Sequence, residues 1–218
     1  MTQGKLLVFS DTHLTPLPDQ RKLDFLLRII NDADQVVING DFWDVCLTDF
    51  SSFVNASFWQ PLFRLLKEKE AIYLYGNHDP EAAQGKAHPF SSTQQSSFEL
   101  NQSGQDFHIE HGNRLAPELD ELHPWLPTWA RALGTHLDNF LTQMLGTVYL
   151  RRSATLNEQM KAWQRENLPP ETYLVCRHSH FGELSRQPRY ANSGSVRGSR
   201  ASYLVIQNGK PKLKKARY

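Results

Sequence analysis

The 218-residue sequence contains only two cysteines, Cys46 and Cys176, which is too few for a disulfide framework and favours a reducing, cytoplasmic location. No apolar run approaches the roughly 18 residues that a transmembrane helix needs, which leaves peripheral contact as the only membrane association to consider. The short apolar stretch near the N-terminus is soon interrupted by Asp11, so it does not fit a secretory signal. The formal net charge of +1 gives the chain no overall attraction to nucleic acid or to an anionic membrane.

The length fits one large domain that buries its own hydrophobic core. Short apolar runs that end in polar residues predict buried strands, and longer segments with apolar residues three or four positions apart predict helices. The predicted strands are 6–9, 36–38, 71–75, 107–110, 172–176 and 203–206, and the predicted helices are 23–30, 58–70, 128–145 and 147–167. The alternation of strands and helices in the first half predicts a layered α/β fold.

Two segments depart from this alternation. Residues from about 115 to 168 begin with a proline-rich stretch and continue as two predicted helices, so we expect a single domain over 1–218 with a helical insertion at about 115–168. The insertion is either a cap over a site or a pair of ordinary packing helices. The last nine residues carry five basic side chains and no acidic one, and we expect them to form a solvated terminus.

Polar clusters follow five of the predicted strands at the point where each strand ends. They are Asp11-Thr-His13, Gly40-Asp41-Phe-Trp-Asp44, Gly76-Asn77-His78-Asp79, His111-Gly112 and His178-Ser-His180. Five of the nine histidines of the chain fall in these clusters. The ends of strands in open α/β sheets are where ligands bind, so we expect the clusters to converge on one site.

The residue types in these clusters indicate metal binding. Carboxylates, imidazoles and amide oxygens are the ligands that Mn²⁺, Fe²⁺ and Zn²⁺ take in proteins. Asp11 and His13 are two positions apart, so on extended backbone their side chains point to the same side and can hold one ion together. Two ions about 3.5–4 Å apart can clamp a phosphate and generate a hydroxide nucleophile.

In this order the motifs DTH, GDFWD, GNHD, HG and RHSH resemble those of the calcineurin-like metallophosphoesterase superfamily. The resemblance implies a layered α-β-β-α sandwich and a dinuclear site with two divalent ions. Mn²⁺ is the expected ion, and Fe, Zn, Ni, Co and Mg are the alternatives. The resemblance assigns the first ion to Asp11, His13, Asp41 and His180. It assigns the second ion to Asp41, Asn77, His111 and His178, with Asp41 bridging the two.

The resemblance also gives His78 a catalytic role, because the histidine of this motif faces the phosphate and stabilises charge or protonates the leaving oxygen. Asp44 or Asp79 would orient that imidazole, and the sequence leaves the choice between them open. Asp44 has the alternative role of capping a following helix. The chain departs from the family pattern at Arg177, which stands where the family has glycine. Its guanidinium would either crowd the site or contact a phosphate.

The implied activity is hydrolysis of a phosphoester or pyrophosphate bond by a metal-bound hydroxide. The helical insertion and the HG motif resemble the UDP-2,3-diacylglucosamine hydrolase-like branch, whose members split a pyrophosphate beneath a helical cap. The expected substrate is therefore a small phosphorylated molecule, such as a nucleotide sugar or a lipid-linked pyrophosphate. The chain has His78 and Asn113 where typical members of that branch have arginine and aspartate.

Two other functions are open at this point. A nuclease or phosphodiesterase acting on nucleic acid or nucleotides would use the basic C-terminal residues, although the sequence gives no firm indication of nucleic-acid binding. A non-catalytic scaffold on the same fold is the other alternative. It is disfavoured because every ligand position of the family pattern is present in this chain.

Overall fold

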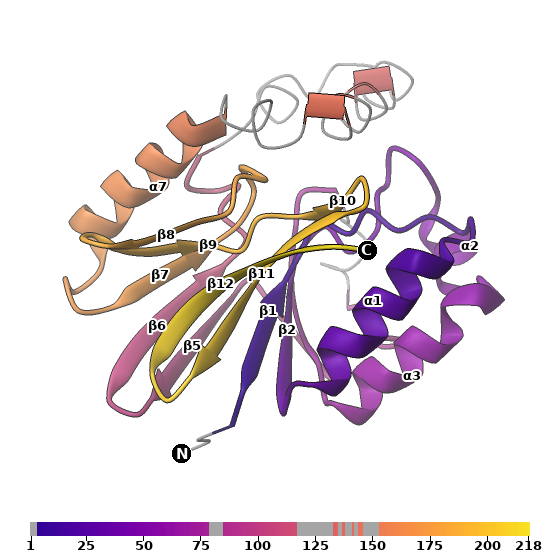
Figure 1. The fold of residues 1–218 in the computed structure, drawn as a ribbon, viewed down its shortest axis with the longest axis horizontal. Helices are drawn as coiled ribbons and strands as arrows, with labels where there is room; N and C mark the ends of the chain where they lie inside the picture. Colours follow the sequence, from indigo (N-terminus) through magenta and orange to yellow (C-terminus); the bar gives the residue numbers. More distant parts are fainter. Residues whose placement is uncertain are drawn as a thin grey trace.

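The computed structural model describes residues 4–78, 85–116 and 153–218, together with residues 133, 134, 137, 141, 144 and 145. Its elements form four layers, in the order helices, sheet, sheet and helix (Figure 1). The layered α-β-β-α sandwich expected from the sequence is therefore confirmed. More than half of the expected insertion at 115–168, including twelve of the 18 residues of the predicted helix 128–145, lies outside the described residues.

Within the described residues the first sheet has seven strands, in the order β10-β11-β1-β2-β3-β4, with β12 paired to β11. Strands β1, β2, β3 and β4 are parallel neighbours, so their carboxyl ends lie at the same edge of the sheet. The bounds are β1 (Leu6–Phe9), β2 (Gln35–Asn39), β3 (Ile72–Leu74), β4 (Thr93–Gln95), β10 (Val196–Arg197), β11 (Arg200–Gln207) and β12 (Lys210–Arg217).

The second sheet has five described strands in the order β5-β6-β7-β9-β8. Strands β6, β7 and β9 run parallel to one another, and β5 and β8 flank them antiparallel. The bounds are β5 (Ser97–Gln102), β6 (Gln105–Glu110), β7 (Tyr173–Cys176), β8 (Glu183–Arg186) and β9 (Arg189–Asn192). Of these strands, the sequence predicted β6 and β7, which are the two that lead into the expected site.

The continuous apolar character of β1 has a direct structural reason. Leu7 and Phe9 pack against the helical layer, whereas Leu6 and Val8 pack into the core between the two sheets. A strand that is buried on both faces needs apolar residues at every position instead of at alternate ones.

Helices α1 (Gln20–Asn31), α2 (Phe50–Val54) and α3 (Gln60–Glu68) cover the outer face of the first sheet, and a 3₁₀ turn, η1 (Ser57–Trp59), leads into α3. Asp19 caps α1 by accepting from the backbone N–H of Lys22. Asp49, and not Asp44, caps α2, since its side chain accepts from the backbone N–H of Ser52. Asp44 is therefore left for the site.

Helix α7 (Ala154–Asn167) lies on the outer face of the second sheet and corresponds to the predicted helix 147–167. Its Met160 packs with Leu174 and Tyr190 of the sheet. None of the helices among the described residues is long and apolar enough to cross a membrane.

The expectation of a solvated C-terminus is wrong. Residues Lys210–Arg217 form β12, which pairs along its whole length with β11. Leu213 packs against the inter-sheet core, and the ring of Tyr218 stacks on Phe25 with 5.1 Å between centroids. These apolar contacts hold the strand in place, while its lysines stay exposed at the edge of the sheet, where charge discourages pairing with other chains.

Candidate metal centre

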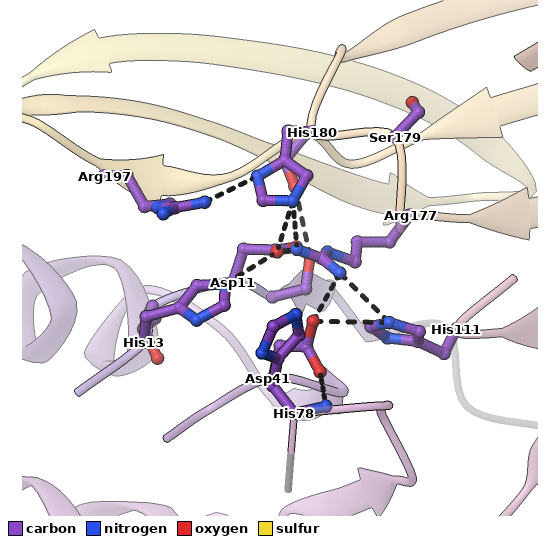
Figure 2. A network of polar contacts seen from close by, with 12 residues as sticks. Asp11, His13, Asp41, His78, His111, Arg177, Ser179, His180 and Arg197 are labelled. Atoms are coloured by element: carbon purple, nitrogen blue, oxygen red, sulfur yellow. Dashed lines mark hydrogen bonds and ion pairs between the residues drawn. The ribbon is translucent and has the colours of Figure 1, made fainter. Parts of the chain in front are cut away.

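The side chains that follow β1, β2, β3, β6 and β7 meet at one edge of the sandwich, where the two sheets face each other (Figure 2). All but one of the sequence-predicted site residues are among those described. The exception is Asp79, the alternative orienting carboxylate, which lies outside the described residues. The buried or nearly buried members are Asp11, His13, Asp41, Asp44, His111 and His178.

The backbone of the centre is strained at five of the predicted ligands. Asp11, His13, Asp41, His178 and His180 have φ angles of 53°, 43°, 51°, 61° and 59°. Residues with a Cβ rarely adopt this left-handed conformation, which costs on the order of 1–3 kcal/mol at each position. The surrounding structure must supply that energy, and such strain concentrates at functional sites.

Asp11 and His13 form the first half of the centre. The Nδ1–H of His13 donates to Asp44 Oδ2 at 2.8 Å, so its Nε2 carries a lone pair and faces Asp11 Oδ1 at 3.3 Å. Burial, followed by the charge of Arg197, lowers the pKa of His13 to about 4, so the ring is neutral at pH 7. Two acceptor atoms thus face each other with no proton between them, which is the arrangement that a cation completes.

His180 joins this half of the centre. Its ligand atom and those of Asp11 and His13 lie within 4.8 Å of one another. Arg197 Nη1 donates to His180 Nδ1 at 3.0 Å. Burial, followed by the charges of Arg177 and Arg197, holds the pKa of His180 well below its ordinary value. The second carboxylate oxygen of Asp11, Oδ2, is buried without a hydrogen-bond partner among the described residues.

Asp41 and His111 form the second half. The Nδ1 of His111 donates to the backbone carbonyl of Asn39 at 2.9 Å, which leaves Nε2 as an acceptor. That Nε2 lies 3.0 Å from Asn77 Oδ1 and 3.5 Å from Asp41 Oδ2. Burial would raise the pKa of Asp41, but the imidazoles of His111 and His78 hold it below its usual range. His178 completes this half, with its ring centroid 5.5 Å from that of His111.

The close packing around His111 explains a glycine of the GDFWD motif. Gly40 has φ +78°, and a Cβ at this position would lie 2.1 Å from His111 Nδ1. Only glycine allows the imidazole to approach the end of β2 this closely.

His78 lies in the centre with 14 % of its side chain exposed, the same fraction as His180. Its backbone N–H donates to Asp41 Oδ1 at 3.0 Å, and its Nδ1 lies 3.4 Å from Asp44 Oδ1. Burial would lower the pKa of His78, but the carboxylates of Asp41 and Asp44 outweigh it and raise the pKa well above the ordinary value. Asp44 thus touches both His13 and His78.

The side chain of Arg177 lies inside the centre and is completely buried. Figure 2 shows its guanidinium pointing between Asp11, Asp41, His111 and His180. Of the two interpretations that the sequence left open, the structure supports crowding, since the guanidinium contacts the predicted metal ligands themselves. The sequence signalled the residue through the missing glycine but did not show which way the side chain points.

A hydrogen-bond network behind the last motif was not found from the sequence. Asn157 Oδ1 on α7 accepts from Ser179 Oγ at 2.6 Å, from Tyr190 OH at 2.9 Å and from Asn192 Nδ2 at 3.0 Å. Asn192 Nδ2 also donates to the backbone carbonyl of Arg177 at 2.7 Å. This network fixes the loop that carries His178 and His180, and no local pattern marks an asparagine in a helix for such a role.

The donors present fit a divalent metal ion. Neutral imidazoles, carboxylates and an amide oxygen converge with lone pairs facing one another, and one carboxylate oxygen is buried with no hydrogen-bond partner among the described residues. Buried anionic groups of this kind need a compensating cation, and the carboxylates of this centre contact the guanidinium of Arg177 where a divalent ion would otherwise neutralise them.

Comparison with known proteins agrees with the fold. The sequence model of the family described as calcineurin-like phosphoesterase matches residues 4–209. The solved structure of Yfce, a phosphoesterase from E. coli, is similar with a TM-score of 0.53 and 19 % identity, over 94 % of this chain and 88 % of that one. None of the curated protein sequences matches the chain.

Two further solved structures are less similar. An archaeal phosphodiesterase has a TM-score of 0.48 and 14 % identity, over 98 % of this chain and 99 % of that one. Vps29 from Entamoeba histolytica, solved with zinc, has a TM-score of 0.49 and 12 % identity, over 98 % of each chain.

Proposed function

This chain belongs to the calcineurin-like phosphoesterase family, and on that premise we propose that it is a metal-dependent hydrolase that cleaves a phosphoester or pyrophosphate bond at a dinuclear centre. The observation that carries the proposal is the convergence of Asp11, His13 and His180, whose ligand atoms lie within 4.8 Å of one another. Asp41 is the proposed bridging ligand, and Asn77, His111 and His178 are the proposed remaining ligands. Mn²⁺ is the proposed ion.

Divalent ions bound at this centre would supply Lewis acidity, which polarises a phosphoryl oxygen and lowers the pKa of a bound water. The chain's own residues orient the ligands and supply a proton to the leaving group. Asp44 fixes the ring of His13 through Nδ1 and also faces His78 Nδ1. His78 lies beside Asp41 and Asp44 and is partly exposed, and in its protonated form it can donate to the oxygen of the leaving group.

The proposed substrate is a small phosphorylated molecule, and the partial resemblance to the UDP-2,3-diacylglucosamine hydrolase-like branch adds nucleotide sugars and lipid-linked pyrophosphates to the candidates. A cytoplasmic location is part of the proposal, since Cys46 and Cys176 are both free thiols. Peripheral contact with a membrane is compatible with such a substrate.

The test is a turnover screen of Mn²⁺-loaded protein against bis-nitrophenyl phosphate, nitrophenyl phosphate, nucleoside diphosphate sugars and nucleotides. We expect hydrolysis of at least one class that EDTA abolishes and fresh Mn²⁺ restores. A protein that binds two ions and turns over none of these classes contradicts the proposal and favours a scaffold. Cleavage of single- or double-stranded DNA, with binding that weakens steeply as salt rises, would identify a nuclease instead.

A further inference from the structure

The two terminal nitrogens of Arg177 each contact one half of the centre. Nη1 donates to Asp41 Oδ2 at 2.7 Å and to His111 Nε2 at 3.0 Å. Nη2 forms an ion pair with Asp11 Oδ1 and lies 3.5 Å from His180 Nε2. Each nitrogen therefore meets a carboxylate and an imidazole that belong to one proposed ligand set.

The contacts of Arg177 and those of a metal ion are mutually exclusive. A guanidinium keeps its charge at physiological pH, and its fork of N–H groups matches carboxylates as a cation would. A Zn²⁺ ion bound to Asp41 and His111 would lie about 2.0–2.2 Å from their donor atoms, in the space that Nη1 already takes. The same holds for Nη2 beside Asp11.

Among the described residues, only these ligand contacts hold the guanidinium in place. The backbone of Arg177 is fixed, because its N–H donates to the carbonyl of His111 at 3.0 Å and its carbonyl accepts from Asn192. Its Nε is buried without a hydrogen-bond partner in the part of the chain that the structure describes. An unsatisfied buried donor is unfavourable, so the buried position of the guanidinium depends on its carboxylate partners.

We propose that Arg177 is a built-in cation that fills both ligand sets of the metal-free protein and competes with divalent ions for them. The inference rests on the proposed metal-dependent function. Because the guanidinium and the ions neutralise the same buried carboxylates, each weakens the binding of the other by the same factor. The chain would then keep a stable centre without metal and bind its ions more weakly than a centre with glycine at this position.

The test compares the wild type with Arg177→Gly by calorimetric titration with Mn²⁺ and by thermal unfolding in EDTA and in excess Mn²⁺. We expect Arg177→Gly to bind Mn²⁺ at least about tenfold more tightly. We also expect Arg177→Gly to unfold at a lower temperature than the wild type in EDTA. Its unfolding temperature should rise more than that of the wild type when Mn²⁺ is added. Arg28→Gln is the matched control, because Arg28 is an exposed arginine on α1 outside the centre, and its loss should change neither the Mn²⁺ affinity nor the rise in unfolding temperature that Mn²⁺ causes.

A second variant, Arg177→Lys, changes the centre less than Arg177→Gly does. Arg177→Lys keeps one charge but loses the fork that reaches both halves, so its Mn²⁺ affinity should lie between those of the wild type and Arg177→Gly. In protein labelled with ¹⁵N-arginine, the signal that disappears in Arg177→Lys should shift in the wild type when Zn²⁺ is added.

The outcomes separate the two proposals. Equal Mn²⁺ affinity in wild type and Arg177→Gly, weaker affinity in the variant, or a guanidinium signal that Zn²⁺ does not move would overturn the competition while leaving the metal-dependent function in place. Absence of metal binding in both wild type and variant would overturn the proposed function and this inference together.

Discussion

Asp44 Oδ2 lies 2.8 Å from His13 Nδ1, and this one contact decides which nitrogen of His13 faces Asp11. The proton stays on Nδ1, and Nε2 is left to bind an ion. The other oxygen of Asp44 accepts from the backbone N–H of Cys46 at 2.8 Å and faces His78. One buried carboxylate therefore sets the orientation of a proposed ligand and of the proposed acid.

Replacing Asp44 with Asn should weaken metal binding by about 10–100-fold, which is the usual effect of removing the partner of a ligating histidine. Titration calorimetry with Mn²⁺ measures this. Asp49→Ala is the control, because Asp49 caps α2 outside the centre, and its loss should cost about 1 kcal/mol of stability with no change in metal affinity. A loss of affinity in Asp44→Asn no larger than in Asp49→Ala would show that Asp44 does not orient His13.

Asp41→Asn should abolish metal-dependent hydrolysis while leaving the fold intact. The amide keeps an oxygen that can accept from the His78 N–H but removes the charge that is proposed to bridge two ions. We expect kcat/KM for the best substrate of the turnover screen to fall by more than the roughly 10–100-fold that is typical of residues behind a ligand. Asp106→Asn, on β6, is the matched control. Near-wild-type turnover in Asp41→Asn with unchanged circular dichroism would rule out the dinuclear arrangement.

Asn157→Leu should destabilise the protein by about 2–4 kcal/mol, because it leaves the hydroxyls of Ser179 and Tyr190 and the amide of Asn192 without their shared acceptor. Urea unfolding in EDTA measures the change. Asn167→Ala, near the exposed end of the same helix, should change stability by no more than about 0.5 kcal/mol. Equal stability of the two variants would mean that the network behind His178 and His180 contributes nothing.

His108 gives a pH dependence that is separate from the metal centre. A hydrogen bond to Glu110 raises the pKa of His108 above 6.5, burial opposes this, and Glu99 adds to it. A raised pKa in the folded state means that the stabilisation is complete below pH 6.5 and is lost as pH rises through the folded pKa. The difference in urea midpoint between wild type and His108→Gln should therefore shrink as pH rises.

The partner of this histidine supplies the control for that pH series. Glu110→Gln removes the carboxylate that raises the pKa of His108 most. In this variant the urea midpoint should therefore depend less on pH than in the wild type. If the urea midpoint of the wild type exceeds that of His108→Gln by a constant amount across the pH series, the titration of His108 does not cause the pH dependence.

The sequence by itself determined the strands that lead to the centre and the residues that end them. β1, β2 and β3 are buried on both faces, so their apolar runs are continuous and visible in the sequence. Because parallel strands place their carboxyl ends at one edge, the strand pattern alone was enough to relate the positions of Asp11, Asp41 and Asn77. The cap of α1 by Asp19 is equally local.

Only the tertiary structure decided which side chains neutralise the buried carboxylates of the centre and which hydrogen-bond the loop that carries His178 and His180. Arg177 and Asp41 are 136 positions apart, and Asn157 and Asn192 are 35 apart, so no local pattern relates them. The direction of a buried side chain depends on what the rest of the fold brings to it. Strands β5, β8 and β12 were missed for the same reason, since they carry many exposed polar residues and are held by pairing with a neighbouring strand.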